Sequence, residues 1–342
     1  DNFVQMFVGW EGVGLCSYLL INFWFTRIQA NKAAIKAMVV NRIGDFGLAL
    51  GIFTIFVCFK AVDYATVFSM VPMFVDSKFI FLNFEINLIS LIGFLLLIGA
   101  VGKSAQLGLH TWLPDAHVEA PTAGSVILAG VLLKLGTYGL IRFSFPLFPE
   151  ASFYFTPLVY AIAVIGIIYT SFTAIRQTDF KRIIAYTSVA HMNLVIVGMF
   201  SFNNIGLEGA ILQSLSHGFV ASALFLIIGV VYERHHTRMV KYYGGLVHVM
   251  PVYIFIFLFF TMANIGLPGT GSFIGEFLIL VGSYQLNSTI TFFSATGMVL
   301  GGCYSLWLFN RIAYGNLKTQ YIKGFNDISR REFHLLLPLI FL

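Results

Sequence analysis

Residues 250–283 read MPVYIFIFLFFTMANIGLPGTGSFIGEFLILVGS, and Glu276 is the one charged side chain among them. At about 34 residues, the stretch is longer than the roughly 20 apolar residues that a helix needs to cross a bilayer. Residues 266–271, Gly-Leu-Pro-Gly-Thr-Gly, interrupt it with helix breakers. Irregular backbone at membrane depth is tolerated only where protein or water lines it. We therefore predict one broken membrane-spanning helix beside a hydrated cavity.

Apolar runs of similar length recur along the whole chain. Of its 342 residues, 58% are hydrophobic and 10% are charged, against about 25% charged residues in a soluble domain. Because the runs do not alternate between polar and apolar residues, they indicate helices and not barrel strands. We predict an all-α polytopic membrane bundle with nine complete spans and the start of a tenth, at about 3–23, 37–59, 86–109, 122–143, 154–175, 183–201, 206–231, 250–283, 290–313 and from 333 onward.

The basic residues predict the orientation of these spans. If successive spans alternate in direction, fifteen of the 20 Lys and Arg residues fall in one set of loops, and three, Lys60, Lys78 and Arg142, fall in the other. This is the bias of the positive-inside rule. The net charge of +5 is therefore a topology signal. It needs no nucleic-acid partner, and anionic lipids, cardiolipin among them, are the expected contacts of the basic loops.

The two remaining basic residues, Lys103 and Lys134, lie inside predicted spans. A charged side chain at the bilayer centre costs at least about 2.5–3.5 kcal/mol, so it usually faces a polar interior and marks function. Glu11 lies in the middle of the first span, and we expect it to pair with Lys103. We also expect Arg42 and Asp45, three residues apart at a helix start, to pair with each other.

His191 and His217 occupy the middle of the sixth and seventh spans, beside small polar residues. Together with Glu11, Lys103, Lys134 and Glu276, they form a succession of ionisable residues along the spans, as a proton relay through a membrane needs. Static ion pairs that hold helices together, and neutral histidines hydrogen-bonded across helices, are the alternatives.

A loop segment reads His110-Thr-Trp-Leu-Pro-Asp115-Ala-His117-Val-Glu119. Its residue types could bind a metal ion, but the Pro114 turn favours helix capping or proton uptake at the membrane surface. The three cysteines, Cys16, Cys58 and Cys303, are isolated in apolar segments and suggest neither a metal site nor disulfides. Dinucleotide, haem and iron–sulfur motifs are absent from the sequence, so we expect no cofactor in this chain.

Long segments resemble the antiporter-like subunits of mitochondrial NADH:ubiquinone oxidoreductase, respiratory complex I. Residues 9–51, GWEGVGLCSYLLINFWFTRIQANKAAIKAMVVNRIGDFGLALG, and 95–116, LLLIGAVGKSAQLGLHTWLPDA, resemble the chain 5 type. Residues 117–144, HVEAPTAGSVILAGVLLKLGTYGLIRFS, and 267–282, LPGTGSFIGEFLILVG, resemble the chain 4 type. The resemblance implies a mosaic with its seam at about 110–116, divided into residues 1–116 and 117–342. We expect the chain to be truncated at both ends, because it stops at Leu342 within an apolar run.

The resemblance implies two inverted five-helix repeats, each with one broken helix, with Lys103 at the first break and Glu276 at the second. It also implies a proton relay formed by Glu11, Lys103, Lys134, His217 and Glu276, with His110 and His191 as further candidates. NADH, FMN, iron–sulfur clusters and ubiquinone would bind other subunits, and the partners would be the other membrane-arm subunits in the mitochondrial inner membrane. Two alternatives stay open: a subunit of a multi-subunit cation/proton antiporter, and a non-functional recombinant product.

Overall fold

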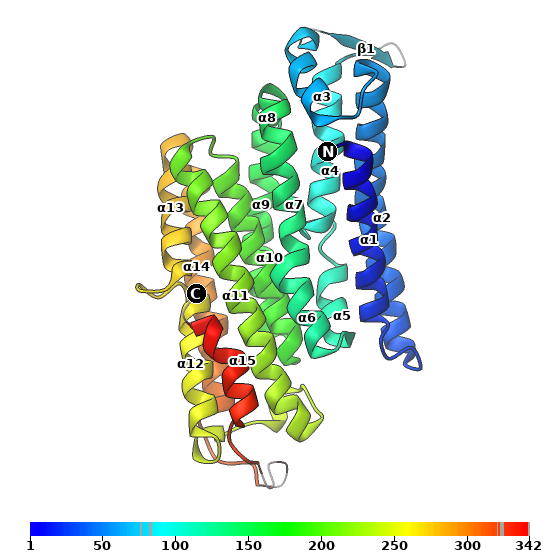
Figure 1. Ribbon diagram of the computed structural model, residues 1–342. Helices are drawn as coiled ribbons and strands as arrows, with labels where there is room; N and C mark the ends of the chain where they lie inside the picture. The colour runs from blue at the N-terminus through cyan, green and yellow to red at the C-terminus, as the bar shows by residue number, and fades with distance from the viewer. Residues whose placement is uncertain (76, 82–83, 320, 322–324, 341–342) are drawn as a thin grey trace.

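The computed structural model describes residues 1–75, 77–81, 84–319, 321 and 325–340. Helices run alternately up and down in one elongated bundle (Figure 1). The first half contains α1 (Phe3–Ile21), α2 (Ile28–Phe59), α3 (Tyr64–Met70), α4 (Leu88–Lys103), α5 (Trp112–Glu119), α6 (Thr122–Ile127), α7 (Leu133–Gly139) and α8 (Phe145–Leu147). The second half contains α9 (Pro149–Arg176), α10 (Phe180–Met199), α11 (Asn204–His235), α12 (Pro251–Ile265), α13 (Gly271–Leu286), α14 (Ser288–Ala313) and α15 (Arg330–Ile340).

Seven helical segments of the described chain are long and apolar enough to cross a membrane. The pairs α4 with α5 and α12 with α13 make two further crossings, so the nine predicted complete spans are confirmed. The largest error at the start of a span is in the second, where the helix begins at Ile28 and not at residue 37. Residues 28–36 are rich in Ala, Lys and Gln, which are good helix formers. The helix therefore extends beyond its apolar part.

The first N–H groups of a helix have no acceptor within the helix, and polar side chains at several helix starts cap them. The side chains of Asn2, Asn87, Asp179, Asn203 and Asn287 accept hydrogen bonds from the first turns of α1, α4, α10, α11 and α14. A small antiparallel hairpin, β1 (Lys78–Phe81) with β2 (Phe84–Asn87), precedes α4. These caps mark where the crossings of α1, α4, α10, α11 and α14 begin.

The two broken crossings run in opposite directions (Figure 1). The first passes from α4 down to α5, and the second passes from α12 up to α13. The predicted break is confirmed, because α12 ends at Ile265 and α13 begins at Gly271. Gly266 and Gly269 between them have φ values of 80° and 100°, a region that glycine adopts without a steric cost. The opposed breaks agree with the expected inverted repeats.

The crossing made by α6, α7 and α8 contains two π-helical segments, Leu128–Leu132 and Leu140–Ser144. Segments of this kind are rare and occur frequently at functional sites, because the extra residue per turn redirects the side chains that follow. Lys134 is the second residue after the first of them.

The predicted division of the basic residues agrees with the direction of the helices. Arg27, Lys181 and Arg234 lie where α1 ends, α10 begins and α11 ends, at the lower end of Figure 1, which we call the basic end. Lys78 lies in β1 and Arg142 precedes α8, both at the upper end. The long loops at the two ends therefore differ in charge as the positive-inside rule requires.

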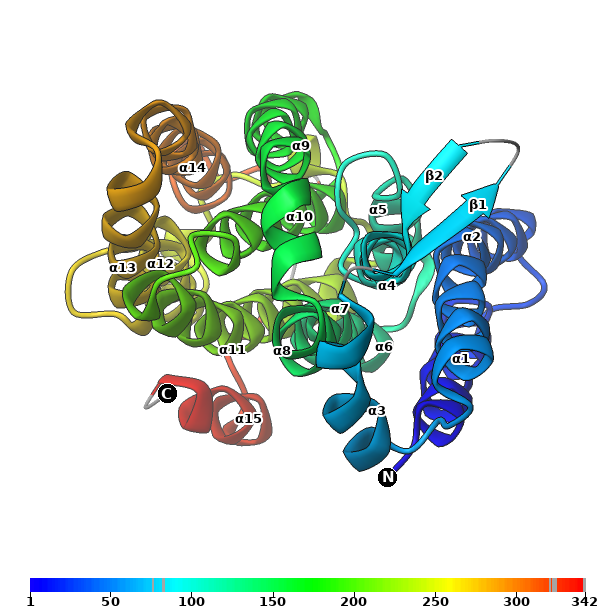
Figure 2. The ribbon, with the colours of Figure 1, turned by 90° about the horizontal axis from the view of Figure 1, so that it is seen from above.

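Seen from above, the bundle is wider in one direction than in the other (Figure 2). The helices α1 and α2 form one edge, α4 and α7 follow, α10 and α11 lie in the centre, and α12, α13 and α14 form the other edge. The short helix α15 lies outside, against α11. Side chains on successive helices can therefore form a line parallel to the membrane.

An ion pair holds α15 to the basic end of α11. The Arg234 guanidinium donates to both oxygens of Glu332, with distances of 2.8 Å and 2.9 Å. The Asp327 carboxylate, a few residues before, accepts hydrogen bonds from the N–H groups of Val252 and Tyr253 at the start of α12. This hydrogen-bonded connection ties the C-terminal part of the described chain to α11 and α12.

The Glu332 contact predicts a pH dependence of the α15 attachment. The hydrogen bonds from Arg234 lower the pKa of Glu332 from its usual 4.5 to about 2. A carboxyl whose pKa is lower in the folded state stabilises it above the unfolded pKa, and that stabilisation disappears as the pH falls through the folded value. Protection factors of the α15 amides in hydrogen exchange should therefore be constant down to about pH 4.5 and fall toward pH 2. Glu332→Gln should remove this pH dependence, whereas Arg331→Gln, beside it, should keep it; equal profiles for Glu332→Gln and the unaltered chain would contradict the assignment.

Candidate functional site

Lys103 is the last residue of α4 and lies at the first break, 1% exposed. Its Nζ is 3.2 Å from Oδ2 of Asp45 on α2. The other oxygen of Asp45 accepts a hydrogen bond of 2.7 Å from the Trp10 indole N–H. The expectation that Asp45 pairs with Arg42 is therefore wrong, because Asp45 points into the bundle and Arg42 points out of it.

Glu11 pairs with Arg42, Oε1 to Nη1 at 2.7 Å, and not with Lys103 as expected. The Arg42 side chain is 53% exposed and that of Glu11 is 20% exposed, so this pair lies at the outer edge formed by α1 and α2. Lys103 nevertheless lies beside α1, because a Cβ added at Gly14, one turn after Glu11, would be 3.0 Å from Nζ. Two carboxylates and two cations thus share the region between α1, α2 and the first break.

Lys134 lies in the centre of the bundle. Its Nζ is 2.7 Å from the carbonyl oxygen of Ala129 and 2.8 Å from Nδ1 of His217 on α11. Among the described residues it has no carboxylate partner. The helix that carries it packs closely on α4, since a Cβ at Gly136 would collide with the Ala100 carbonyl oxygen. The Lys103 and Lys134 helices are in direct contact, but no side-chain hydrogen bond joins the two lysines within the described chain.

Glu276, on the first turns of α13 after the second break, contacts α10 and α11. Its Oε1 is 3.2 Å from Nδ1 of His191 and accepts a hydrogen bond of 3.1 Å from Gln213 Nε2. The His191 and His217 rings lie 5.3 Å apart, centroid to centroid. Lys134, His217, His191 and Glu276 therefore form one contiguous series of side chains, half-buried at Lys134 and buried at the other three, from the centre of the bundle to the second break.

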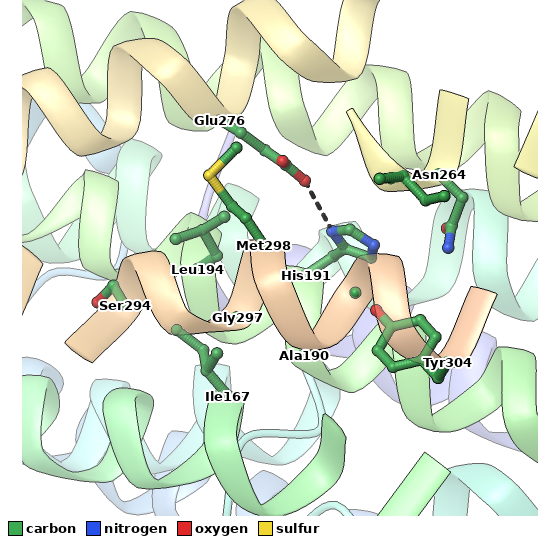
Figure 3. A pocket seen from close by; sticks show the side chains of 12 residues that line it. Ile167, Ala190, His191, Leu194, Asn264, Glu276, Ser294, Gly297, Met298 and Tyr304 are labelled. Carbon is green, nitrogen blue, oxygen red and sulfur yellow. Dashed lines mark ion pairs between the residues drawn. The ribbon is translucent and has the colours of Figure 1, made fainter. Parts of the chain in front are cut away.

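A small cavity adjoins this series (Figure 3). His191, Glu276, Asn264 and Tyr304 line it, and Figure 3 shows the Glu276 carboxylate directed at the His191 ring. The volume of the cavity is about 20 Å³, which is enough for about one water molecule. Oε2 of Glu276 and Nε2 of His191 are buried without a protein partner in the described chain. A cavity beside the break, with polar atoms that need a partner, agrees with the hydrated cavity expected from the sequence.

The segment 110–119 is divided between surface and interior. Asp115 pairs with Lys36 at 2.7 Å and Arg182 at 2.8 Å. His110 is buried and lies edge-on to Tyr169, with ring centroids 5.7 Å apart, away from the series that ends at Glu276. Within the described residues, no three His, Cys, Asp or Glu side chains are close enough together to hold a metal ion.

Two contacts of the site were not predicted. Asp45 lies in a polar group of its span, Asn41-Arg42-Ile43-Gly44-Asp45, and both Arg42 and Lys103 were possible partners. Gln213 lies in an apolar span four residues before His217, so it is on the same helix face one turn away. That spacing is the one sequence signal that connects it to the site.

The fold and these side chains define a polytopic α-helical membrane protein with ionisable groups distributed across the bundle between two broken crossings. The chain belongs to the family described as NADH:quinone oxidoreductase/Mrp antiporter, transmembrane, which matches residues 1–301. NADH-ubiquinone oxidoreductase chain 4 of Marchantia polymorpha is 51% identical over 338 residues, covering 98% of this chain and 65% of the relative. The chain 4 of Chondrus crispus is 46% identical over 341 residues, covering 100% of this chain and 67% of the relative.

The chain thus spans about two thirds of the length of these curated relatives. A subunit in the structure titled respiratory complex I from Thermus thermophilus with bound NADH has the same fold, with a TM-score of 0.85 and 21% identity over 99% of this chain and 70% of that one. Relatives named chain 4 align on both sides of residues 110–116. A chain-5-like origin for residues 1–109 is not shown by these alignments and stays a prediction.

Proposed function

We propose that this chain is a proton-translocating membrane-arm subunit of a respiratory complex I, in which NADH oxidation and ubiquinone reduction occur on other subunits. The observation that carries the proposal is the contiguous series Lys134, His217, His191 and Glu276. A proton relay needs ionisable groups within hydrogen-bond reach of each other, or separated by one water. Lys134 and His217 meet that condition, as do His191 and Glu276, and the His217 and His191 rings lie 5.3 Å apart, centroid to centroid.

The contact between Lys134 and His217 suggests how a proton moves. When the Lys134 ammonium donates to Nδ1 of His217, the neutral ring carries its proton on Nε2. Transfer to Nδ1 would make His217 an imidazolium and Lys134 a neutral amine. Release from Nε2 toward water and His191 then restores a neutral ring. The Glu276 carboxylate stabilises the positive charge on its arrival at His191.

The proposal extends to location and partners. The chain would lie in the mitochondrial inner membrane, as the chain 4 names of its relatives suggest, beside other complex I membrane-arm subunits. Anionic lipids, including cardiolipin, would contact the basic end. We propose no cofactor within this chain. Residues 1–116 would hold one half-channel around Lys103, and residues 117–342 would hold the second, ending at Glu276.

Glu276→Gln in an assembled complex that contains this chain tests the proposal. The amide can keep the hydrogen bond from Gln213 but cannot carry a negative charge, so we expect the number of protons pumped per NADH to fall several-fold. The measurement is dye-reported acidification of proteoliposomes, with electron transfer followed in parallel. Glu208→Gln is the matched control, because Glu208 is an exposed glutamate on α11. Unchanged pumping by an intact Glu276→Gln complex would contradict the proposal.

A cation/proton antiporter is the second candidate, because the description of the matching family includes Mrp antiporters. It predicts sodium-dependent proton movement that needs no NADH. The same proteoliposomes distinguish the two functions, with a sodium gradient imposed in place of NADH oxidation.

A further inference from the structure

A polar cavity lies at the basic end, where α2 and α10 begin and α5 ends. Its volume is about 190 Å³, many times the roughly 10–15 Å³ that one water needs. Since α5 packs on both α2 and α10, three helices enclose it. None of its lining residues belongs to the proposed relay. The charged ones are Lys32, Lys36, Asp115, Glu119 and Arg182.

The cavity carries a surplus of positive charge. Asp115 accepts hydrogen bonds from both Lys36 and Arg182, at 2.7 Å and 2.8 Å, and balances one of these two cations. The other carboxylate, Glu119, lies 3.9 Å from a cation outside the lining, the Arg238 guanidinium. The third lining cation, on α2, forms no ion pair within the described chain. Three cations less the charge of Asp115 leave two positive charges, and a cleft of one sign attracts ions of the other.

The donors around the cavity suit a phosphate group. Arg182 gives Asp115 one hydrogen bond, from Nη2, and its side chain is 44% exposed. A guanidinium has five N–H donors in a planar fork that matches pairs of phosphate oxygens, so several donors remain for another acceptor. Lys32 and Lys36 add two ammonium groups, which bind phosphate as point charges. Cations from α2 and α10 can therefore bind different oxygens of one phosphate.

An apolar stripe on α2 begins beside these lysines. Ile28, Ile35, Val39 and Ile43 are 54–69% exposed, and their spacing of seven, four and four residues places them on one helix face. Lys32 is on the same face, four residues after Ile28. From Lys32 to Ile43 the helix rises about 17 Å, which is about half of the roughly 30 Å hydrocarbon thickness of a bilayer. The stripe therefore extends from the cavity through one leaflet.

Aromatic side chains mark the membrane surface at the same place. Phe23, Trp24 and Phe25, in the turn between α1 and α2, are 54%, 48% and 71% exposed. Exposed aromatic residues, Trp among them, gather at the level of the lipid headgroups. The first turn of α2 follows directly and leads to the lysines of the cavity. The cavity is therefore at headgroup depth.

We propose that this cavity binds the phosphate of an anionic phospholipid, with Lys32, Lys36 and Arg182 around the phosphate and an acyl chain along the apolar stripe of α2. The inference rests on the proposed function only in expecting anionic lipids at the basic end, and it adds the site. Soluble phosphate would use the cations but leave the stripe uncovered, so the stripe favours a lipid. A bound headgroup would join α2 to α10 beside α5, the second half of the first broken crossing.

Photolabelling of the assembled complex tests the site. The complex is placed in phosphatidylcholine vesicles with a little phosphatidylglycerol that carries a diazirine in one acyl chain, and labelled peptides are identified by mass spectrometry. We expect label on residues 28–43. The same diazirine on phosphatidylcholine should label them about fivefold less, because its choline cation would lie beside the lysines. Equal labelling by the two lipids, or loss of the label in excess inorganic phosphate, would overturn the lipid site.

Lys32→Gln should lower this labelling about fivefold, the contribution of one cation near an anionic headgroup. Adding Arg182→Gln should lower it about twentyfold or more. Lys241→Gln is the matched control, because Lys241 is an exposed lysine at the basic end outside the cavity. Equal labelling of Lys32→Gln and the control would overturn the site. If the double variant does not assemble, Lys32→Gln decides, since its loss breaks no ion pair within the described chain.

Proton pumping in the same vesicles separates this inference from the proposed function. If α2 is labelled as expected but Lys134→Leu pumps normally, the relay is overturned and the lipid site is supported. If Lys134→Leu does not pump but phosphatidylglycerol does not label α2 in the unaltered complex, the lipid site alone is overturned.

Discussion

Lys134→Leu is expected to lower proton transfer through the chain by about a hundredfold while the bundle still folds. Within the described chain, Lys134 is the one ammonium in contact with His217, at 2.8 Å, so leucine removes the group that is proposed to deliver protons to the second half of the chain. Folding should survive because no buried carboxylate depends on this charge in the described chain. Two acceptors lose the hydrogen bond from Lys134: the Ala129 carbonyl oxygen and His217 Nδ1. The Ala129 carbonyl oxygen is also part of the helix backbone.

The measurement is NADH-driven acidification of proteoliposomes that contain the assembled complex, with the amount of complex determined by native electrophoresis. Arg142→Leu is the matched control, because it removes an exposed cation from the same crossing, eight residues after Lys134. It should pump normally. Normal pumping by an assembled Lys134→Leu complex would show that Lys134 is a packing residue and that the series through His217 is not a relay.

The breaks and the depth of the charged residues could be predicted from the sequence because each depends on local properties. Gly266, Pro268 and Gly269 are helix breakers that stand within four residues of each other, so the interruption before Glu276 could be predicted from this local cluster. The central position of Lys134 follows from the length of apolar sequence on each side. These predictions use distance along the chain, and the structure confirms them.

The pairing of the charges could not be predicted, because it depends on the rotation of each helix about its axis. Arg42 and Asp45 are three residues apart and were expected to pair, but they point away from each other, Arg42 to Glu11 and Asp45 to Lys103. At about 100° per residue, side chains three residues apart differ by about 60° around the helix, and here that difference places Asp45 against Lys103 and Arg42 at the outer edge. Apolar residues on every face of a membrane helix give no pattern from which this rotation can be read. The stacking of His117 on Phe225 is hidden for the same reason.

Asp45→Ala is expected to destabilise the bundle by about 3–5 kcal/mol, because it leaves the Lys103 ammonium buried without a counter-charge. Lys103 and Asp45 are 1% and 3% exposed, so water cannot replace the lost partner. The Trp10 indole N–H loses its acceptor in the same variant. Thermal unfolding of the assembled complex, followed by loss of the intact band on native gels, measures the effect. Glu208→Ala, which removes an exposed carboxylate of α11, should change it little; equal effects of the two variants would contradict a buried pair.

The double variant Asp45→Leu with Lys103→Met separates the two interpretations of these intramembrane charges. Replacing a buried ion pair with apolar residues of similar size is often neutral for stability, so the double variant should regain most of the stability that Asp45→Ala loses. If the pair only holds helices together, proton pumping should return with it. If Lys103 carries protons in the first half-channel, stability returns and pumping stays low. We expect the second result. The Lys103 ammonium lies at a helix break, near carboxylates on two different helices, so it can change partners as protons move. Methionine has no charge and cannot take that role.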